Sequence, residues 1–176
     1  KDIRATFITH MHDDHAGGLS ALLKQIIKPY NYCKETFTLY LPEEAAIEPL
    51  KAWMRAVHED ADSPLLCYRS YGAGKVYEDD NLTVTAISTC HLRTRGRTEG
   101  DPCSYALILD FKKDGKRILH TGDLIDFLTH GCGAHAQKML ENTDCFFAMG
   151  NHELCHQVGK AREDLSYKME QLPICQ

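Results

Sequence analysis

The sequence contains no apolar run that approaches the roughly 20 residues of a membrane-spanning helix, so we expect no membrane segment. It also lacks internal repeats and low-complexity segments. Charge of neither sign dominates: 20 basic and 25 acidic residues give a net charge of -5. Such a balance provides no general attraction to RNA or DNA. A nucleic-acid partner therefore stays open, but the net charge does not support one.

The eight cysteines include no CxxC pair of the kind used by zinc ribbons, and no signal peptide is visible. Several of them lie in apolar, strand-like segments, where a free cysteine behaves as a small hydrophobic residue. We therefore expect a reduced, cytoplasmic protein rather than a disulfide framework. With 176 residues, 43% of them hydrophobic, the chain is long enough for a single globular domain with its own core.

Hydrophobic patterning predicts strands mixed with helices. The predicted strands cover residues 3–9, 36–41, 82–90, 104–111, 117–120 and 145–149, and the predicted helices cover residues 19–27, 42–59, 134–141 and 159–171. Residues 60–75 are expected to be irregular because Pro64, Gly72 and Gly74 interrupt them. This mixture indicates an α/β or α+β fold built of packed layers.

The densest group of candidate ligands lies in the segment FITHMHDDHAGGL, residues 7–19. Its four candidate metal ligands are His10, His12, Asp14 and His15. We expect them on a loop after the first predicted strand, and such crowding is rare without a function. Imidazoles with a carboxylate suit zinc, iron or manganese better than calcium. Gly17 and Gly18 are expected to let the chain turn sharply into the next helix.

Two further candidate ligands end predicted strands. His91 follows the strand over residues 82–90, and Asp123 follows residues 117–121 in the sequence HTGD. A lone histidine after a strand is more often structural than a ligand, but the first motif makes a metal role the better interpretation. Because a sandwich of sheets can bring strand ends together, we expect both side chains to join the first motif.

The sequences THMHDDHAGG and ILHTGD, with the strand end at His91 between them, resemble the metallo-β-lactamase superfamily over residues 3–123. The resemblance implies an αββα sandwich with a dinuclear metal centre at one edge. By position it assigns one ion to His10, His12 and His91, the other to Asp14 and His15, and a bridging role to Asp123. Zinc is favoured, with iron or manganese as alternatives. A water bridging the two ions would lose its proton near neutral pH and act as the nucleophile, and Asp14 would orient it or accept a proton.

Members of this superfamily normally have several strands before the motif, whereas only about eight residues precede it here. We therefore expect a fold truncated at its N-terminus, with an open sheet edge. A homo-oligomer is one way to complete such a sheet, and an inactive metal-binding module is another outcome of truncation. The superfamily's last metal-binding histidine sits on a later strand end, for which His152 is the best candidate.

A second resemblance covers residues 120–170. GDLID, followed after 23 residues by GNHE, resembles the calcineurin-like metallophosphoesterases. In that pattern Asp123 would bridge two metals, Asn151 would bind one of them, and His152 would assist the leaving group. The upstream DxH of that family has Thr89 in place of its aspartate, and the later GHxH is absent.

The two resemblances meet at Asp123. We interpret residues 1–176 as one metallo-hydrolase domain, with a lactamase-like part over residues 1–123. Residues 124–176 would be a metallophosphoesterase-like or completing segment, and a chimeric chain stays open.

Three arginines follow His91 in the sequence HLRTRGRTEGD: Arg93, Arg95 and Arg97. Guanidinium groups bind phosphate or carboxylate in a bidentate manner, although a solvated loop without a specific role is an equal alternative. Both resemblances imply two-metal hydrolysis. We therefore expect a hydrolase that acts on a phosphodiester or other anionic ester, with a small-molecule or nucleotide-like substrate.

Overall fold

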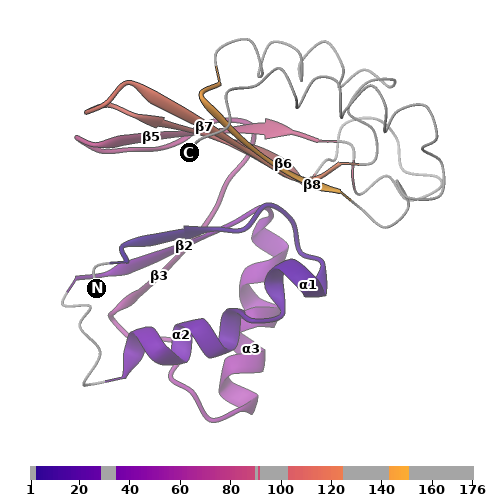
Figure 1. Cartoon of the computed structure of the whole chain (residues 1–176). Helices are drawn as coiled ribbons and strands as arrows, with labels where there is room; N and C mark the ends of the chain where they lie inside the picture. Colours follow the sequence, from indigo (N-terminus) through magenta and orange to yellow (C-terminus); the bar gives the residue numbers. More distant parts are fainter. Residues whose placement is uncertain (1–2, 29–34, 90, 92–102, 125–142, 151–176) are drawn as a thin grey trace. The chain divides into compact units, whose positions relative to one another are not determined.

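The structure is a computed structural model that describes residues 3–28, 35–89, 91, 103–124 and 143–150. The chain divides into two compact units, Lys1–Gly72 and Ala73–Gln176. The first contains a three-stranded sheet and the second a five-stranded sheet (Figure 1). Strands mixed with helices confirm the predicted α/β fold class. The predicted helices over residues 134–141 and 159–171 lie outside the described residues, and the single-domain interpretation stays a prediction.

The sheet of the first unit is parallel, in the order β1-β2-β3. Its strands are β1 (Ala5–Phe7), β2 (Phe37–Leu41) and β3 (Leu66–Ser70). Along β2, Phe37, Leu39 and Leu41 alternate onto one face of the sheet and are fully buried. On the opposite face the ring of Tyr40 stacks on Phe7 of β1, with ring centroids 4.5 Å apart.

The helical elements of this unit are α1 (Asp13–Ala16), α2 (Leu19–Ile27), the 3-10 turn η1 (Glu44–Ala46) and α3 (Ile47–Ala56). Helices α2 and α3 lie on the same side of the three-stranded sheet (Figure 1). Leu19, Leu23 and Ile26 form the buried stripe of α2 and share a hydrophobic core with Met54 of α3 and the apolar face of β2. Each such side chain contributes about 1.5–3 kcal/mol through its burial. The predicted amphipathic helix over residues 19–27 is confirmed.

The helix predicted over residues 42–59 is shorter at both ends in the structure: η1 precedes α3, and a left-handed residue closes the C-terminus of α3. His58 has a φ of +62°, which is incompatible with a continuing α-helix. Its N–H donates to the Arg55 carbonyl at 3.0 Å, and the Glu59 N–H donates to the Met54 carbonyl at 2.9 Å. This pair of bonds satisfies the last carbonyls of α3.

The expectation of an irregular segment over residues 60–75 is confirmed for residues 60–65 and 71–73, which form no helix or strand, but it is wrong for the residues of β3 and β4. Strand β3 pairs in parallel with β2 along its whole length, and β4 (Gly74–Glu78) begins at a glycine with φ of +116°. Gly72 lies in the connection between the two strands. Strand formation here depends on pairing with a partner distant in sequence, which local breaker residues do not reveal.

The second unit has the strand order β4-β5-β6-β7-β8. Its remaining strands are β5 (Leu82–Ser88), β6 (Tyr105–Phe111), β7 (Lys116–Leu124) and β8 (Cys145–Gly150). Strands β4 to β7 pair antiparallel, whereas β8 pairs in parallel with β7. The predicted hairpin turn is confirmed: Phe111 pairs with Lys116, and Gly115 has a φ of +65°.

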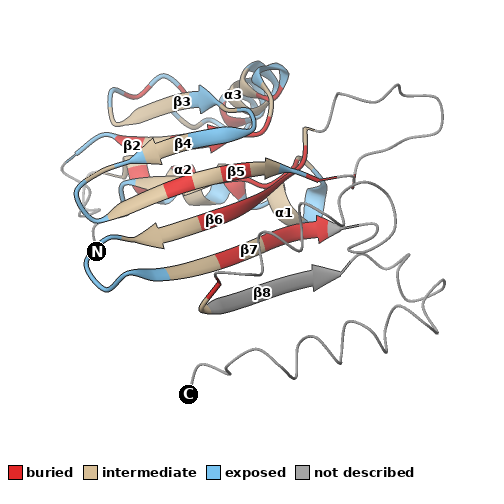
Figure 2. Cartoon of the chain, turned by 90° about the horizontal axis from the view of Figure 1, so that it is seen from above, coloured by how far each residue is buried: buried red, intermediate tan, exposed pale blue. Residues whose placement is uncertain are grey.

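Burial in the second unit is concentrated on the inner strands of its sheet. Figure 2 shows buried residues on β5, β6 and β7, whereas β4 is exposed or partly exposed. Ala106, Ile108 and Leu119 form the described core cluster of this sheet. The charged side chains of Lys75 and Glu78 on β4 disfavour pairing of this edge strand with another chain. Within the described residues, no helix is long and apolar enough to cross a membrane.

Candidate functional site

The histidine-rich motif consists of an extended segment followed by one helical turn. His10 and His12 follow β1, and helix α1 begins at Asp13. The N–H groups of His15 and Ala16 both donate to the His12 carbonyl, at 3.0 and 2.8 Å. The expectation of a loop is therefore wrong for residues 13–16. Carboxylates in the first turn of a helix interact favourably with its dipole, which explains why the two aspartates fit this turn.

His10 lies at the centre of the three histidines of the motif. Its side chain is fully buried, and its ring centroid lies 4.6 Å from that of His12 and 4.1 Å from that of His15. A ring nitrogen of His10 lies within 4.8 Å of a ring nitrogen of each of the other two. Three imidazoles whose nitrogens converge in this way are a donor set that suits zinc or a similar divalent ion.

Thr9 orients the ring of His10, a contact that the sequence interpretation missed. Its hydroxyl oxygen lies 3.2 Å from His10 Nδ1, and Thr9 itself is 6% exposed. A polar partner at one ring nitrogen of a metal-binding histidine fixes the ring and selects the other nitrogen as the ligand atom. The geometry therefore favours Nε2 of His10 as its ligand atom.

Asp14 and His15, which the first resemblance assigns to the same ion, lie next to each other on α1. Asp14 Oδ2 is 3.7 Å from His15 Nε2. The side chain of Asp14 is 74% exposed, whereas that of His15 is only 10% exposed. The carboxylate of Asp14 is therefore open to solvent, whereas the imidazole of His15 is enclosed by the protein.

The two glycines form the turn between α1 and α2, as expected, without a left-handed conformation. Gly17 has a φ of -60° and Gly18 a φ of -81°, both ordinary values for any residue. Gly17 is nevertheless constrained, because a Cβ atom there would lie 2.5 Å from the Asp13 carbonyl oxygen. The close approach of the backbone, rather than its dihedral angles, explains this glycine.

The second unit holds the two remaining described candidate ligands, His91 and Asp123. His91 Nε2 lies 3.7 Å from Asp123 Oδ2, and the two residues are 5% and 7% exposed. The chain before His91 is anchored to the start of β6: the Thr89 and Ser104 hydroxyl oxygens are 2.7 Å apart, and the Thr89 N–H donates to the Ser104 carbonyl at 2.9 Å. The strand end that carries His91 is therefore fixed by a buried hydroxyl pair.

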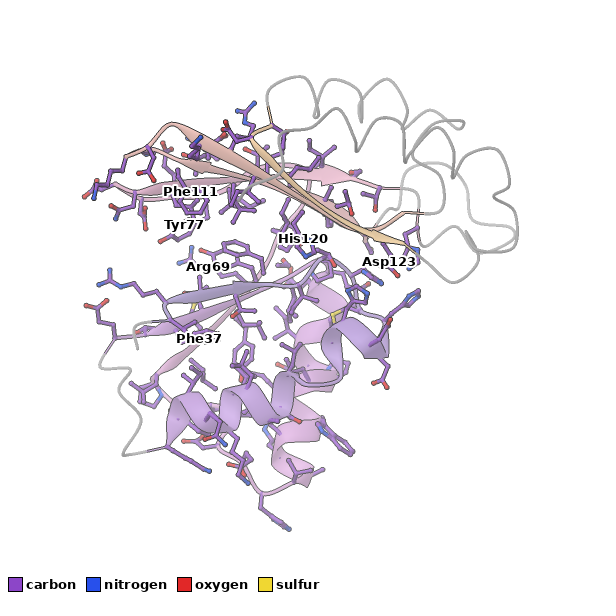
Figure 3. The ribbon with its side chains drawn as sticks, in the orientation of Figure 1. Phe37, Arg69, Tyr77, Phe111, His120 and Asp123 are labelled. Atoms are coloured by element: carbon purple, nitrogen blue, oxygen red, sulfur yellow. The ribbon has the colours of Figure 1, made fainter. Side chains whose placement is uncertain are left out.

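A bulge in β7 determines the direction of Asp123. The register with β8 shifts between His120 and Asp123, and Gly122 has a φ of +57°. The Gly122 N–H donates to His120 Nδ1 at 3.2 Å, and the Thr121 hydroxyl donates to the Gly122 carbonyl at 2.7 Å. Bulges of this kind redirect the side chain that follows them. His120 therefore has a structural contact, and Figure 3 shows it with Asp123 on β7.

The other predicted site residues lie outside the described residues: Arg93, Arg95, Arg97, Asn151 and His152. Their roles stay predictions, and so does the resemblance of the second part to calcineurin-like metallophosphoesterases.

Comparison with known families and proteins gives an independent result. A family model described as "Beta-lactamase superfamily domain" matches residues 1–157. Ribonuclease Z of Parasynechococcus marenigrum (strain WH8102) is 31% identical over 97 residues, and ribonuclease Z of Bacillus subtilis (strain 168) is 33% identical over 91 residues. These alignments cover 51% and 52% of this chain but 28% of each relative, so the chain matches under a third of the length of these proteins.

The fold is similar to that of a solved structure, the crystal structure of the short form of human tRNase Z. The TM-score is 0.61 at 18% sequence identity, over 94% of this chain and 62% of the human chain. At this identity the similarity concerns the fold alone. It agrees with the two sheets and few helices of the described residues.

Proposed function

Because the chain belongs to the metallo-β-lactamase superfamily, we propose that it is a metal-dependent phosphodiesterase that cleaves RNA. The observation that carries this proposal is the position of His10, which has a ring nitrogen within 4.8 Å of a ring nitrogen of His12 and within 4.8 Å of one of His15. The matched curated relatives, which are ribonucleases, support the substrate class.

We propose that the chain binds two divalent ions, as the resemblance to the metallo-β-lactamase superfamily implies. We assign one ion to His10, His12 and His91, the other to Asp14 and His15, and a bridging position to Asp123, with His152 as the last ligand. Zinc is the favoured metal because imidazole nitrogens predominate, with iron or manganese as alternatives. When bound, such ions lower the pKa of a water towards neutrality and offset the negative charge of the attacked phosphate.

The side chains of the chain itself have separate tasks in this proposal. Asp14, with its exposed carboxylate, accepts a proton from the attacking water. Thr9 holds the ring of His10 through its Nδ1 contact. Arg93, Arg95 and Arg97 bind the phosphate group of the substrate, since guanidinium groups match two phosphate oxygens at once.

We propose RNA rather than a small phosphodiester as the substrate. Because the net charge of the chain is -5, local groups must provide the electrostatic attraction to RNA. Three arginines after His91 are the candidates for this local contact. Salt dependence distinguishes the two substrate classes, because binding of a polyanion weakens steeply as salt rises.

The test compares hydrolysis of bis-p-nitrophenyl phosphate with cleavage of an RNA. Both are measured before and after chelation and with added zinc, manganese or iron. His12→Asn is expected to reduce hydrolysis of both substrates by more than about 100-fold. Loss of a residue that only supports a metal ligand costs up to about 100-fold, and His12 is proposed to be a ligand itself. His58→Asn is the matched control, because His58 is also an exposed histidine but lies at the end of α3. Hydrolysis that resists chelation, or equal activity of the two variants, would contradict the proposal.

A further inference from the structure

The strand that leads into the histidine motif is short and pairs with a single described neighbour. β1 has three residues and pairs in parallel with β2, with Phe7 opposite Tyr40. Along this ladder the Thr38 N–H donates to the Arg4 carbonyl at 2.8 Å, and the Ile8 N–H donates to the Tyr40 carbonyl at 3.0 Å. Each of these bonds depends on a backbone N–H at the right position of one strand.

The next bond of the ladder cannot form. The N–H of Thr38 donates to the Arg4 carbonyl. Four residues further along both strands, the N–H of residue 42 would donate to the Ile8 carbonyl. Residue 42 is a proline, which has no N–H. Pro42 is buried and Ile8 is only 7% exposed, so bulk water has little access to this carbonyl. The strand ladder therefore provides no backbone donor for the carbonyl of Ile8, two residues before His10.

Tyr71, which directly follows β3 at the opposite edge of the sheet from β1, supplies that donor. Its backbone N–H donates to the Leu41 carbonyl at 3.0 Å, which ties the residue to the end of β2. Its side chain reaches past β2 to β1, where the hydroxyl donates to the Ile8 carbonyl at 2.6 Å. One side chain thus joins the ends of β1 and β2 at the start of the motif.

We propose that Tyr71 is a positioning residue for the metal motif: its hydroxyl replaces the hydrogen bond that Pro42 cannot make and so holds the imidazoles of His10 and His12 in place to bind metal. This inference rests on the proposed function. Thr9 follows Ile8 directly, so the contact of its hydroxyl with His10 Nδ1 depends on the same backbone position. Loss of the Tyr71 hydroxyl therefore disturbs both the backbone and the ring of the ligand.

The chain offers a matched control for this test. Tyr68 also donates its hydroxyl to a backbone carbonyl of the same unit, that of Ala61 at 3.0 Å, and Ala61 lies outside the motif. Zinc affinity of the full chain is measured by competition with a chromophoric chelator for Tyr71→Phe and Tyr68→Phe. Tyr71→Phe is expected to weaken zinc binding by at least about tenfold, whereas Tyr68→Phe leaves it unchanged.

Two further measurements keep the inference testable if the single variant is unstable. In the metal-free protein, amide hydrogen exchange of Ala16 and Gly17, which donate to His12 and Asp13, is expected to accelerate in Tyr71→Phe and not in Tyr68→Phe. Pro42→Ala in the Tyr71→Phe background returns an N–H to residue 42 and is expected to restore zinc affinity.

The outcomes separate this inference from the proposed function. Equal zinc affinity of the two single variants, or no recovery in the double variant, overturns the role of Tyr71 and leaves the proposed function standing. A wild-type chain that binds neither zinc, manganese nor iron overturns the proposed function and this inference with it.

Discussion

Nε2 of His91 lies 3.7 Å from Oδ2 of Asp123, although His91 follows β5 and Asp123 lies near the end of β7, two strands separated by β6 in the sheet. Their side chains are 1% and 10% exposed. Imidazole nitrogens and carboxylate oxygens are both ligands of zinc and similar divalent ions. This pair is therefore the part of the second unit that we assign to metal binding.

Replacement of this carboxylate by an amide is expected to remove metal from the protein. Asp123→Asn keeps the shape of the side chain but removes the negative charge proposed to bridge two ions. Elemental analysis of the reconstituted wild-type chain should give close to two ions per chain, a number that follows from the two-metal assignment. The variant should hold one ion or none, and an unchanged metal content would contradict the assignment of Asp123.

The bulge before Asp123 gives a prediction that separates stability from metal binding. Gly122 and Gly115 both have positive φ values, +57° and +65°, and any other residue is strained there. Alanine at either position is expected to lower the free energy of unfolding by about 1–2 kcal/mol, measured by urea denaturation. Only Gly122→Ala should also weaken zinc binding, because Gly115 lies in the distant hairpin turn of the same sheet. Equal zinc affinities would show that the bulge does not position Asp123.

The left-handed residue at the end of α3 predicts a stabilising substitution. His58 adopts a φ of +62°, which costs a residue with a Cβ atom about 1–2 kcal/mol relative to glycine. His58→Gly is therefore expected to raise the urea midpoint and leave hydrolysis unchanged. A lower midpoint would mean that side-chain contacts of His58 outweigh the backbone strain.

Acid is expected to weaken the β4–β5 hairpin. The hydroxyl of Tyr77 donates to the carboxylate of Asp79 at 2.7 Å, and this bond, with the N–H groups of Asn81 and Leu82 at 2.7 Å, holds the pKa of Asp79 below its ordinary value. Since the folded-state pKa is the lower one, this stabilisation is complete above the unfolded pKa of about 3.9 and disappears as the pH falls through the folded-state value.

The corresponding measurement is the thermal midpoint as a function of pH. Asp79→Ala should lower it at pH 7, and the difference from wild type should shrink as the pH falls below about 4. The exposed neighbour Asp80 provides the control substitution, Asp80→Ala, because the three hydrogen bonds described above go to Asp79. A difference that is constant with pH would contradict the role of the Asp79 carboxylate.

Local patterns predicted those parts of the molecule that depend on local interactions. The spacing of Leu19, Leu23 and Ile26 gave the buried face of α2, and the crowding of ligands around His10 identified the motif. Strand β3 escaped prediction because it forms by pairing with β2 rather than through a pattern of its own.

The supporting contacts of the site were missed for a similar reason. The bond from Tyr71 to Ile8 joins residues 63 positions apart, and no periodicity predicts it. A proline directly after a strand was the one local signal, since it removes a donor that another group must replace. Likewise, the glycine of HTGD was visible in the sequence, but only its positive φ shows that it redirects Asp123.

The most direct test of the central claim is an anomalous-difference map, collected at the zinc edge, from a crystal of the zinc-loaded full chain. We predict two peaks, one in contact with His10, His12 and His91 and the other in contact with Asp14 and His15, with Asp123 in contact with both. A map without a peak at His10, or with zinc bound only at other residues, would contradict the account.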